Sequence, residues 1–516
     1  MLLLVLMPWT LLSCNSEISF TVYVGEGTAS LDPKKCMSRA EETYISNLYS
    51  GLYEYVADGD SYKLSPADAE DFPKVSETED GKYVYTFTLR EGLKWSNGDS
   101  ITPEDYVTAW NESAAYSLYT DKGYIFSLID GYETYTSYEE NAALNMTFDN
   151  KNRTFSVTVT ENSERFLAYT TSTALLPTSK NARRDSTEWD SDSEFFASNG
   201  AYTLASLSKD ELVLKKNKYY RNADSALADK ITFIFDTQKA AEMVKDEKLD
   251  FAFTERLSFG GYTDKTAVGI KYLAFNADDK SIGVFKVEHQ KMIREAIGIY
   301  AVESGAFTGI PESLCPYLEK TNNGNDQNDG GTSMTNYADL LLETVALESD
   351  LFTWQNGKAY EFPVLTALSA GRDGEDRDLG ELAEYLKEKG ISLRVQNADF
   401  NSFLDIRDAG EYSMLINSWS YSTLSDGEFL RMFLSNSIYN DTRLGMEYDS
   451  TWKNIYDSRL LFSIDRLSAS VEIFVDAYET LKAQKCLFAL GNIERKVYMK
   501  SGVPFTVLRN GIVRFC

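Results

Sequence analysis

Residues 83–110 read YVYTFTLREGLKWSNGDSITPEDYVTAW, and this stretch begins with a strand pattern. Apolar side chains recur at every second position from Tyr83 to Leu89, which is the period of a β-strand with one buried face. Asn97-Gly98 follows after a short break, and this pair readily takes the positive φ angles of a tight turn. The first half of the stretch therefore predicts a strand followed by a turn.

The second half of the stretch carries the signals of a helix start. Thr102 is a good N-cap, and Pro103 suits the first helical position. Glu104 and Asp105 follow at the positive end of the helix dipole. The next apolar residues predict an amphipathic helix: Tyr106, Val107, Ala109 and Trp110.

Length and composition describe a globular protein. The chain has 516 residues, of which 43% are hydrophobic and 25% are charged, so two or three folding units with real cores are expected. The net charge of −28 would repel the phosphates of DNA or RNA, which argues against a nucleic-acid partner.

The N-terminus has the pattern of a secretion signal. The segment MLLLVLMPWTLLSCNS is apolar as far as Leu12 and is too short to span a membrane, so residues 1–13 are interpreted as a signal peptide. Leu11-Leu12-Ser13-Cys14 looks like a lipobox, in which the signal is cleaved before Cys14 and the thiol receives a lipid. The sequence thus predicts a protein outside the membrane, at the extracellular face or in the periplasm, tethered only by this lipid.

Cysteine and histidine usage limits the chemistry that we expect. Apart from Cys14, four cysteines remain, and they either form one of three pairings or stay as buried free thiols: Cys36, Cys315, Cys486 and Cys516. His289 is the single histidine, in a lysine-rich context without a nucleophile motif. We therefore expect no metal site, no cofactor and no enzymatic activity.

Strand and helix patterns alternate along the rest of the chain, which predicts an α/β sheet protein. A new folding unit is expected to begin near Gly269. The predicted strands are 18–25, 154–159, 211–216, 231–235, 248–254, 270–276, 362–368, 392–396, 413–417 and 503–508. The predicted helices include 41–55, 238–247, 379–389 and 469–488. The Asn/Asp/Gly-rich segment 321–336 is expected to be an exposed loop.

The order of residues in 83–110 closely resembles the signature of extracellular solute-binding protein family 5, the oligopeptide- and dipeptide-binding lipoproteins of ABC importers. Four further groups of segments resemble this family in the same order along the chain: 30–33 with 47–52, 199–204 with 212–220, 403–405 with 410–412 and 418–419, and 503–505. The similarity of each group alone is weak evidence, but five matches in the right order are specific to the family.

The resemblance implies a two-lobed α/β fold of the periplasmic-binding-protein type (type II, cluster C) with an extra domain inserted in lobe one. It places lobe one at 17–55, 165–268 and 495–516, the inserted domain at 56–164, and lobe two at 269–494. Hinge closure between the lobes would trap the ligand. The chain is thereby expected to be a monomeric, lipid-anchored protein that captures oligopeptides and delivers them to an ABC permease complex.

The resemblance also implies where the ligand lies. Members of the family hold the ligand's main chain in a strand-like way between the lobes. Arg407 matches a position that can hold a ligand carboxylate. The other matching positions on the two lobes are Met37, Ser38, Arg39, Phe253, Thr254, Asn417, Ser418 and Trp419.

Ser422 departs from the family pattern. Peptide-binding members have an aspartate here that pairs with the ligand's α-ammonium, and a serine lacks that charge-assisted bond, worth roughly 1.5–3 kcal/mol. Asp426 and Glu428 are nearby acids that would replace it only if the loop shifts. Two alternatives therefore stay open: the same fold binding a non-peptide solute such as an oligosaccharide or a metal chelate, or a surface sensor that does not transport.

Overall fold

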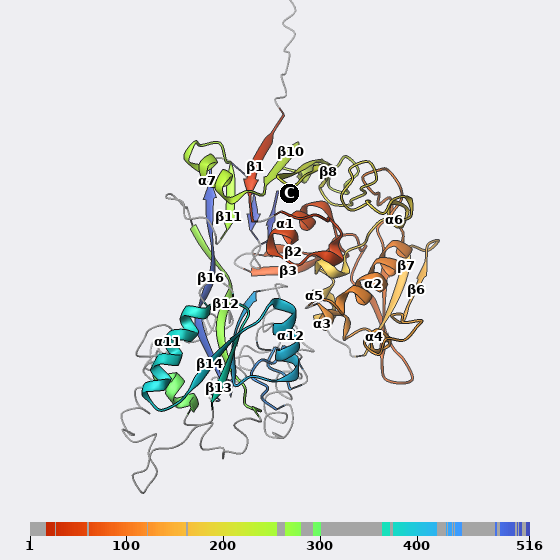
Figure 1. The fold of residues 1–516 in the computed structure, drawn as a ribbon. Helices are drawn as coiled ribbons and strands as arrows, with labels where there is room; N and C mark the ends of the chain where they lie inside the picture. Colours follow the sequence, from red (N-terminus) through yellow and green to blue (C-terminus); the bar gives the residue numbers. More distant parts are fainter. Residues whose placement is uncertain are drawn as a thin grey trace, which may run out of the picture.

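The fold is known from a computed structural model of the whole chain (Figure 1). The described residues are 17–254 (without 26, 59–60, 121 and 161–163), 264–279, 293–300, 364–371, 375–420, 430–445 (without 431, 436 and 438), 480–500 (without 482–483 and 485), 503, 505–507 and 512–515. The predicted signal peptide, Cys14, the 321–336 loop, His289 and Ser422 lie outside this set.

One mixed sheet of ten strands runs through the molecule in the order β14-β13-β15-β12-β16-β11-β1-β10-β9-β8. The first five strands in this order are β14 (Leu393–Asn397), β13 (Leu365–Ser369), β15 (Met414–Ser420), β12 (Asp264–Phe275) and β16 (Leu487–Met499). The other five are β11 (Phe251–Thr254), β1 (Ser19–Tyr23), β10 (Lys230–Ile234), β9 (Glu211–Lys216) and β8 (Tyr202–Leu207). The alternating patterns thus correctly predicted an α/β sheet.

The long strands β12 and β16 join two lobes (Figure 1). Near its end, β16 pairs with β11 of lobe one, from Lys496↔Thr254 to Met499↔Phe251. The last part of β12 pairs instead with β15 of lobe two, from Gly269↔Ser420 to Phe275↔Met414. The hydrophobic core of lobe two is separate and contains only residues between Ile270 and Ala489. The chain is therefore a two-lobed α/β protein, while its predicted domain boundaries stay a prediction.

The ladder between β12 and β16 is irregular between the lobes. Its register shifts between Ala267 and Gly269, and again between Lys271 and Tyr272. A β-bulge of this kind bends and twists a strand locally. Both irregularities lie next to the point where β12 passes from the ladder of lobe one to that of lobe two.

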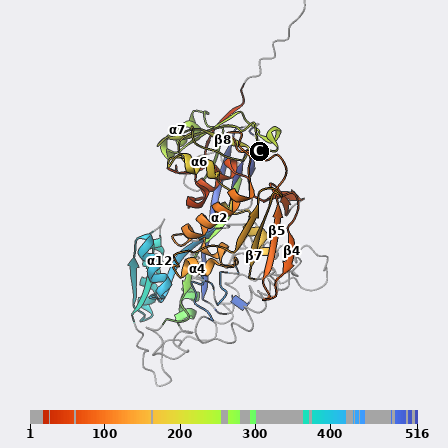
Figure 2. The ribbon, with the colours of Figure 1, turned by 90° about the vertical axis from the view of Figure 1, so that its right-hand side faces the viewer.

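A second sheet in lobe one contains the residues quoted first. Its order is β4-β5-β7-β6, with β4 at Lys74–Glu77, β5 at Tyr83–Thr88, β7 at Thr154–Val159 and β6 at Met146–Asp149. Helix α2 (Pro103–Ser117) packs on it, with the Trp110 ring 5.6 Å from Phe155. Figure 2 shows α2 and these strands together. The predicted strand and helix start are both confirmed.

The start of α2 explains why Thr102-Pro103 was a reliable signal. The Asp105 carboxylate accepts hydrogen bonds from the Thr102 backbone N–H and hydroxyl, each at 2.8 Å. Its other oxygen accepts from the backbone N–H of Lys180 at 3.0 Å, at the start of α6 (Lys180–Asp185). The buried Asp105 therefore closes one helix end and ties it to the next.

The predicted helix 41–55 is wrong beyond Leu48. Helix α1 spans Arg39–Leu48, and strand β2 (Tyr53–Asp58) begins shortly after it. The backbone N–H of Ser50 donates to the Asn199 side-chain oxygen at 3.0 Å, so a distant residue takes the donor that another helical turn would have used. Leu52 is buried although it lies outside the helix, which is why the apolar spacing misled.

The remaining described elements are short. They are β3 (Ser61–Pro66), β17 (Thr506–Val507), β18 (Val513–Arg514), α3 (Gly123–Phe126), α4 (Tyr132–Thr136), α5 (Glu164–Tyr169), α7 (Thr237–Lys245), α11 (Glu375–Glu388), α12 (Phe400–Ala409) and the 3-10 turns η1 (Pro33–Lys35), η2 (Thr173–Leu175) and η3 (Ala223–Ser225). The predicted helix 469–488 is wrong at its end, where β16 begins at Leu487; most of it lies outside the described residues.

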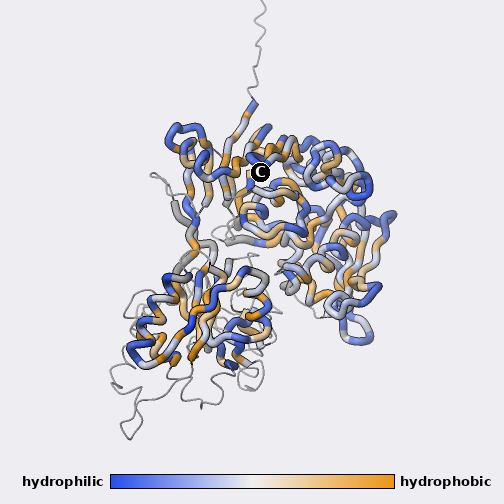
Figure 3. The backbone as a smooth tube through the Cα atoms, in the orientation of Figure 1, coloured by the Kyte–Doolittle hydropathy of each residue, from blue (hydrophilic) through white to orange (hydrophobic). Residues whose placement is uncertain are grey.

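The distribution of hydropathy matches this architecture. In Figure 3 hydrophobic residues gather where strands and helices pack, and hydrophilic ones lie on outer turns. The core of the four-stranded sheet is continuous with that under α1, so the expected inserted domain shares its core with lobe one. Within the described ranges, no helix combines the length and apolar character that crossing a membrane requires.

Candidate ligand-binding site

The predicted ligand stretch of lobe one lies between η1 and α1. Met37 is 52% exposed, and Ser38 is the N-cap of α1. The Glu41 carboxylate accepts the backbone N–H groups of Met37 at 2.8 Å and Ser38 at 3.0 Å. A ligand that pairs with these two amides would therefore have to displace Glu41.

The other predicted residues of lobe one are less exposed. The Arg39 guanidinium is ion-paired with Glu42 one turn along α1. Phe253 and Thr254 end β11, where both are buried and pair with Val497 and Lys496 of β16. The side chains of Phe253 and Thr254 thus belong to the packed wall of lobe one in this structure.

In lobe two, Asn417, Ser418 and Trp419 lie side by side on β15 and are partly buried. They pair with Tyr272, Lys271 and Ile270 of β12. The structure therefore places this predicted stretch on β15, which pairs with β12, one of the two strands that join the lobes. Ser422 and its potential substitutes Asp426 and Glu428 lie outside the described residues.

Asp441 gathers several of these residues, and sequence reasoning missed it. Its carboxylate Oδ2 accepts from the Tyr272 hydroxyl at 2.7 Å and from the Asn417 amide at 2.9 Å. Asp441 is 1% exposed, and its Oδ1 has no hydrogen-bond partner among the residues that the structure covers. Burial raises the pKa of Asp441, against the opposing effects of Arg407, Tyr272 and Asn417.

Arg407 belongs to the same cluster. It lies in the last turn of α12 with 11% of its side chain exposed, and its guanidinium contacts Asp408 at 2.8 Å. Burial lowers the pKa of Arg407, but Asp441 and Asp408 outweigh this effect, and the pKa is raised overall. Of the predicted residues, Asn417 is thus hydrogen-bonded to Asp441, and Arg407 feels the charge of the same buried acid.

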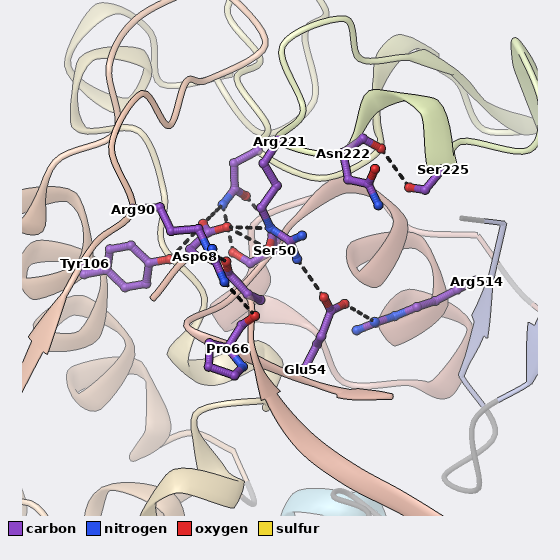
Figure 4. A network of polar contacts seen from close by, with 12 residues as sticks. Ser50, Glu54, Pro66, Asp68, Arg90, Tyr106, Arg221, Asn222, Ser225 and Arg514 are labelled. Carbon is purple, nitrogen blue, oxygen red and sulfur yellow. Dashed lines mark hydrogen bonds and ion pairs between the residues drawn. The ribbon is translucent and has the colours of Figure 1, made fainter. Parts of the chain in front are cut away.

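A second buried acid, Asp68, organises lobe one (Figure 4). Its carboxylate accepts from the Ser50 hydroxyl at 2.9 Å, the Tyr106 hydroxyl at 3.0 Å and the Asn199 amide at 2.8 Å. The Arg221 guanidinium lies 3.5 Å from it. Burial raises the pKa of Asp68 to about 6, while Arg221 and the hydrogen bonds act against this rise.

The Asp68 network reaches the C-terminal strand β18. Glu54 accepts from Arg221 at 2.7 Å and from Arg514 at 3.1 Å (Figure 4). The network therefore connects Tyr106 of the first-quoted stretch with Asn199 and with Arg221, the residue directly after 212–220. Both oxygens of Asp68 are in use, so we assign this network to the architecture of lobe one.

Lys122 is a further residue that sequence reasoning missed. It precedes α3 and is 8% exposed. Its ammonium donates to the Cys36 backbone carbonyl at 2.8 Å and to the Thr173 hydroxyl at 2.7 Å. No sequence signal marks this lysine, because both partners are distant in the chain.

The described cysteines are not paired. Cys36 and Cys486 are buried free thiols, and Cys315 and Cys516 lie outside the described residues. In the part of the chain that the structure covers, no group of three or more His, Cys, Asp or Glu side chains is arranged to hold a metal ion.

Comparison with known proteins agrees with this architecture. The profile of the bacterial extracellular solute-binding proteins, family 5 Middle, matches residues 63–302. The dipeptide-binding protein DppE of Bacillus subtilis (strain 168) is 24% identical over 462 residues, which are 84% of this chain and 81% of DppE. The oligopeptide-binding protein OppA of the same organism is 23% identical over 84% of this chain and 79% of its own.

Solved structures are similar over nearly the whole length. The murein tripeptide binding protein MppA of Escherichia coli superposes with a TM-score of 0.65 over 96% of each chain, at 18% sequence identity. The matched family and these relatives are described as binding proteins. Residues 63–302 thus match family 5 of the bacterial extracellular solute-binding proteins, and the chain has the two-lobed periplasmic-binding-protein-like fold of the solved structures.

Proposed function

We propose that this chain is the substrate-binding protein of a peptide ABC importer. It captures oligopeptides between its two lobes, outside the cell membrane, and delivers them to the permease complex. The observation that carries the proposal is similarity over 84% of the chain to relatives named dipeptide- and oligopeptide-binding proteins.

The proposed ligand contacts come from both lobes. Lobe one contributes Met37–Arg39 with Phe253 and Thr254. Lobe two contributes Arg407, Asn417–Trp419 and Ser422. Pairing with the ligand's main chain gives affinity with little dependence on its sequence, and bridging waters adapt the site to different side chains.

The proposal includes the way in which the protein is held. Residues 1–13 are removed as a signal peptide, Cys14 carries the lipid, and the protein acts as a monomer without catalysis. Lobe one is 17–55, 165–268 and 495–516, the inserted domain is 56–164, and lobe two is 269–494.

Native mass spectrometry of the purified protein tests the proposed function. We expect bound masses that, after release under denaturing conditions, fragment as peptides. Bound glycans alone, or no binding across libraries of two- to five-residue peptides, would overturn it. A metal chelate or an oligosaccharide in the site would support the second candidate, a non-peptide solute, which the missing charge at Ser422 favours.

A further inference from the structure

Lys122 is a buried lysine without an acidic partner among the residues that the structure describes. Lysine is almost never fully buried unless it is paired, because removing its charge from water costs several kcal/mol. Yet its ammonium donates to two neutral oxygens, the backbone carbonyl of Cys36 and the hydroxyl of Thr173. Among the residues that the structure describes, no carboxylate lies within ion-pair distance of Lys122.

The acids nearest to this part of lobe one have other partners. Glu41 accepts the backbone N–H groups of Met37 and Ser38, and Glu42 is paired with Arg39. Lys122 still acts electrostatically on its surroundings: burial raises the pKa of the Cys36 thiol to about 12, and Lys122 opposes that rise. Its positive charge is therefore felt next to the predicted ligand stretch without being neutralised there.

Lys122 is also adjacent to the predicted ligand stretch of lobe one. It binds the carbonyl of Cys36, the residue directly before Met37–Arg39. Figure 1 places α12, the helix of Arg407, next to the end of lobe one that carries α3 and α4, and Figure 2 agrees, with α12 beside α4. Thr173, its other partner, lines a small cavity of about 50 Å³ beside α1.

Arg407 and Lys122 differ in whether acidic residues of the protein already interact with their charge. The Arg407 charge is already shared with Asp408 and Asp441 inside lobe two. The Lys122 ammonium donates to two neutral acceptors in the described part of the chain, and an ammonium has three N–H donors. A carboxylate that reaches Lys122 would gain a charge-assisted hydrogen bond in a poorly hydrated place.

We infer that Lys122 is an anion-binding residue of the ligand site, which holds a carboxylate of the bound solute against lobe one. The inference rests on the proposed function and adds to it a preference for solutes with a carboxylate. That carboxylate is either the C-terminus of a peptide or an acidic side chain, and both have the same chemistry.

The test uses the purified full protein with four probes, measured by isothermal titration calorimetry. Tri-alanine and its C-terminal amide report on a terminal carboxylate. Acetyl-Ala-Glu-Ala-amide and acetyl-Ala-Gln-Ala-amide report on a side-chain carboxylate. If the wild type binds none of the four, the proposed function itself fails for short peptides, and the Lys122 inference is overturned with it.

The decisive variants are Lys122→Gln and Lys122→Met. Lys122→Gln keeps amide donors for Cys36 and Thr173 but removes the charge. A loss of binding in this variant is therefore not expected to result from unfolding. We expect both variants to weaken one acid probe about 10-fold or more and its neutral partner less than about 2-fold. Lys122→Arg, which keeps the charge, should recover part of the acid preference.

Lys82→Met is the matched control, because Lys82 is a cation of the same region that already contacts Asp130 at 2.7 Å. It should leave the ratio of acid to neutral affinity unchanged. If Lys122→Gln loses affinity equally for the acid and neutral probes, Lys122 has only a structural role, in which it links Cys36 to Thr173 by hydrogen bonds. An unchanged acid preference in that variant would overturn the inference as well.

Discussion

Asp68 in lobe one and Asp441 in lobe two have the same kinds of hydrogen-bond donors around them, but their carboxylate oxygens are not equally satisfied. Each is a buried carboxylate that accepts from a tyrosine hydroxyl and an asparagine amide and has an arginine nearby. Asp68 uses both oxygens, whereas Oδ1 of Asp441 has no hydrogen-bond partner within the described part of the chain.

The difference separates architecture from the proposed site. A fully satisfied buried network stabilises and specifies one arrangement, while a partly satisfied one is costly to keep. Asp68 ties together segments of lobe one. Asp441 instead accepts a hydrogen bond from Asn417 and acts electrostatically on Arg407, and both are proposed ligand residues. A role in ligand binding would account for the cost of its incomplete network.

The largest expected effect is on stability when Asp68 is removed. Asp68→Ala should lower the free energy of unfolding by about 3–5 kcal/mol, because it leaves several buried donors without an acceptor. Asp441→Ala should cost only about 1 kcal/mol, since it also removes an unsatisfied oxygen. Denaturant unfolding measures both, with the exposed Asp224→Ala as the control, expected within about 0.5 kcal/mol of the wild type. Similar losses at both aspartates would break the comparison.

Removing the tyrosine hydroxyls sharpens the comparison of the two aspartates. Here we expect the larger loss of stability in lobe two. Tyr106→Phe leaves Asp68 with Ser50, Asn199 and Arg221, so we expect a loss of about 0.5–1 kcal/mol. Tyr272→Phe leaves Asp441 with only the Asn417 bond, so the expected loss is about 1.5–3 kcal/mol. Thermal unfolding of the two variants gives the ranking, and a larger loss for Tyr106→Phe would contradict it.

A further expected effect is a pH dependence that Asp68 imposes. Because its pKa of about 6 lies above the usual value of 3.8, the folded state binds this proton more tightly than the unfolded chain. Its contribution to stability is therefore present at low pH and is lost as the pH rises through 6. From pH 7 to pH 5 the wild type should gain about 1 kcal/mol relative to Asp68→Asn. Parallel stability curves for the two proteins would refute the assignment.

Local signals predicted the parts of the fold that depend on neighbouring residues. The strand at Tyr83–Thr88 and the helix start at Pro103 were correct because alternation, N-cap and first-turn acid all act within a few residues. The predicted helix 41–55 failed because Asn199, far along the chain, takes the Ser50 amide. Local periodicity contains no information about such a partner.

The site was predictable only in part, for the same reason. Asn417 and Arg407 were identified through the family resemblance, but Asp441, which interacts with both, stands in a polar segment without a motif. Lys122 was missed because its partners are 86 and 51 residues away. Burial without a countercharge becomes visible only when the chain is folded.

Small-angle X-ray scattering with and without the peptides that copurify with the protein tests the central claim most directly. The claim is that one solute is held between the two lobes, which β12 and β16 join. We predict that the radius of gyration falls as peptide saturates the protein, because the lobes close on it. An unchanged radius of gyration at saturation, with binding verified by calorimetry on the same sample, would contradict the claim.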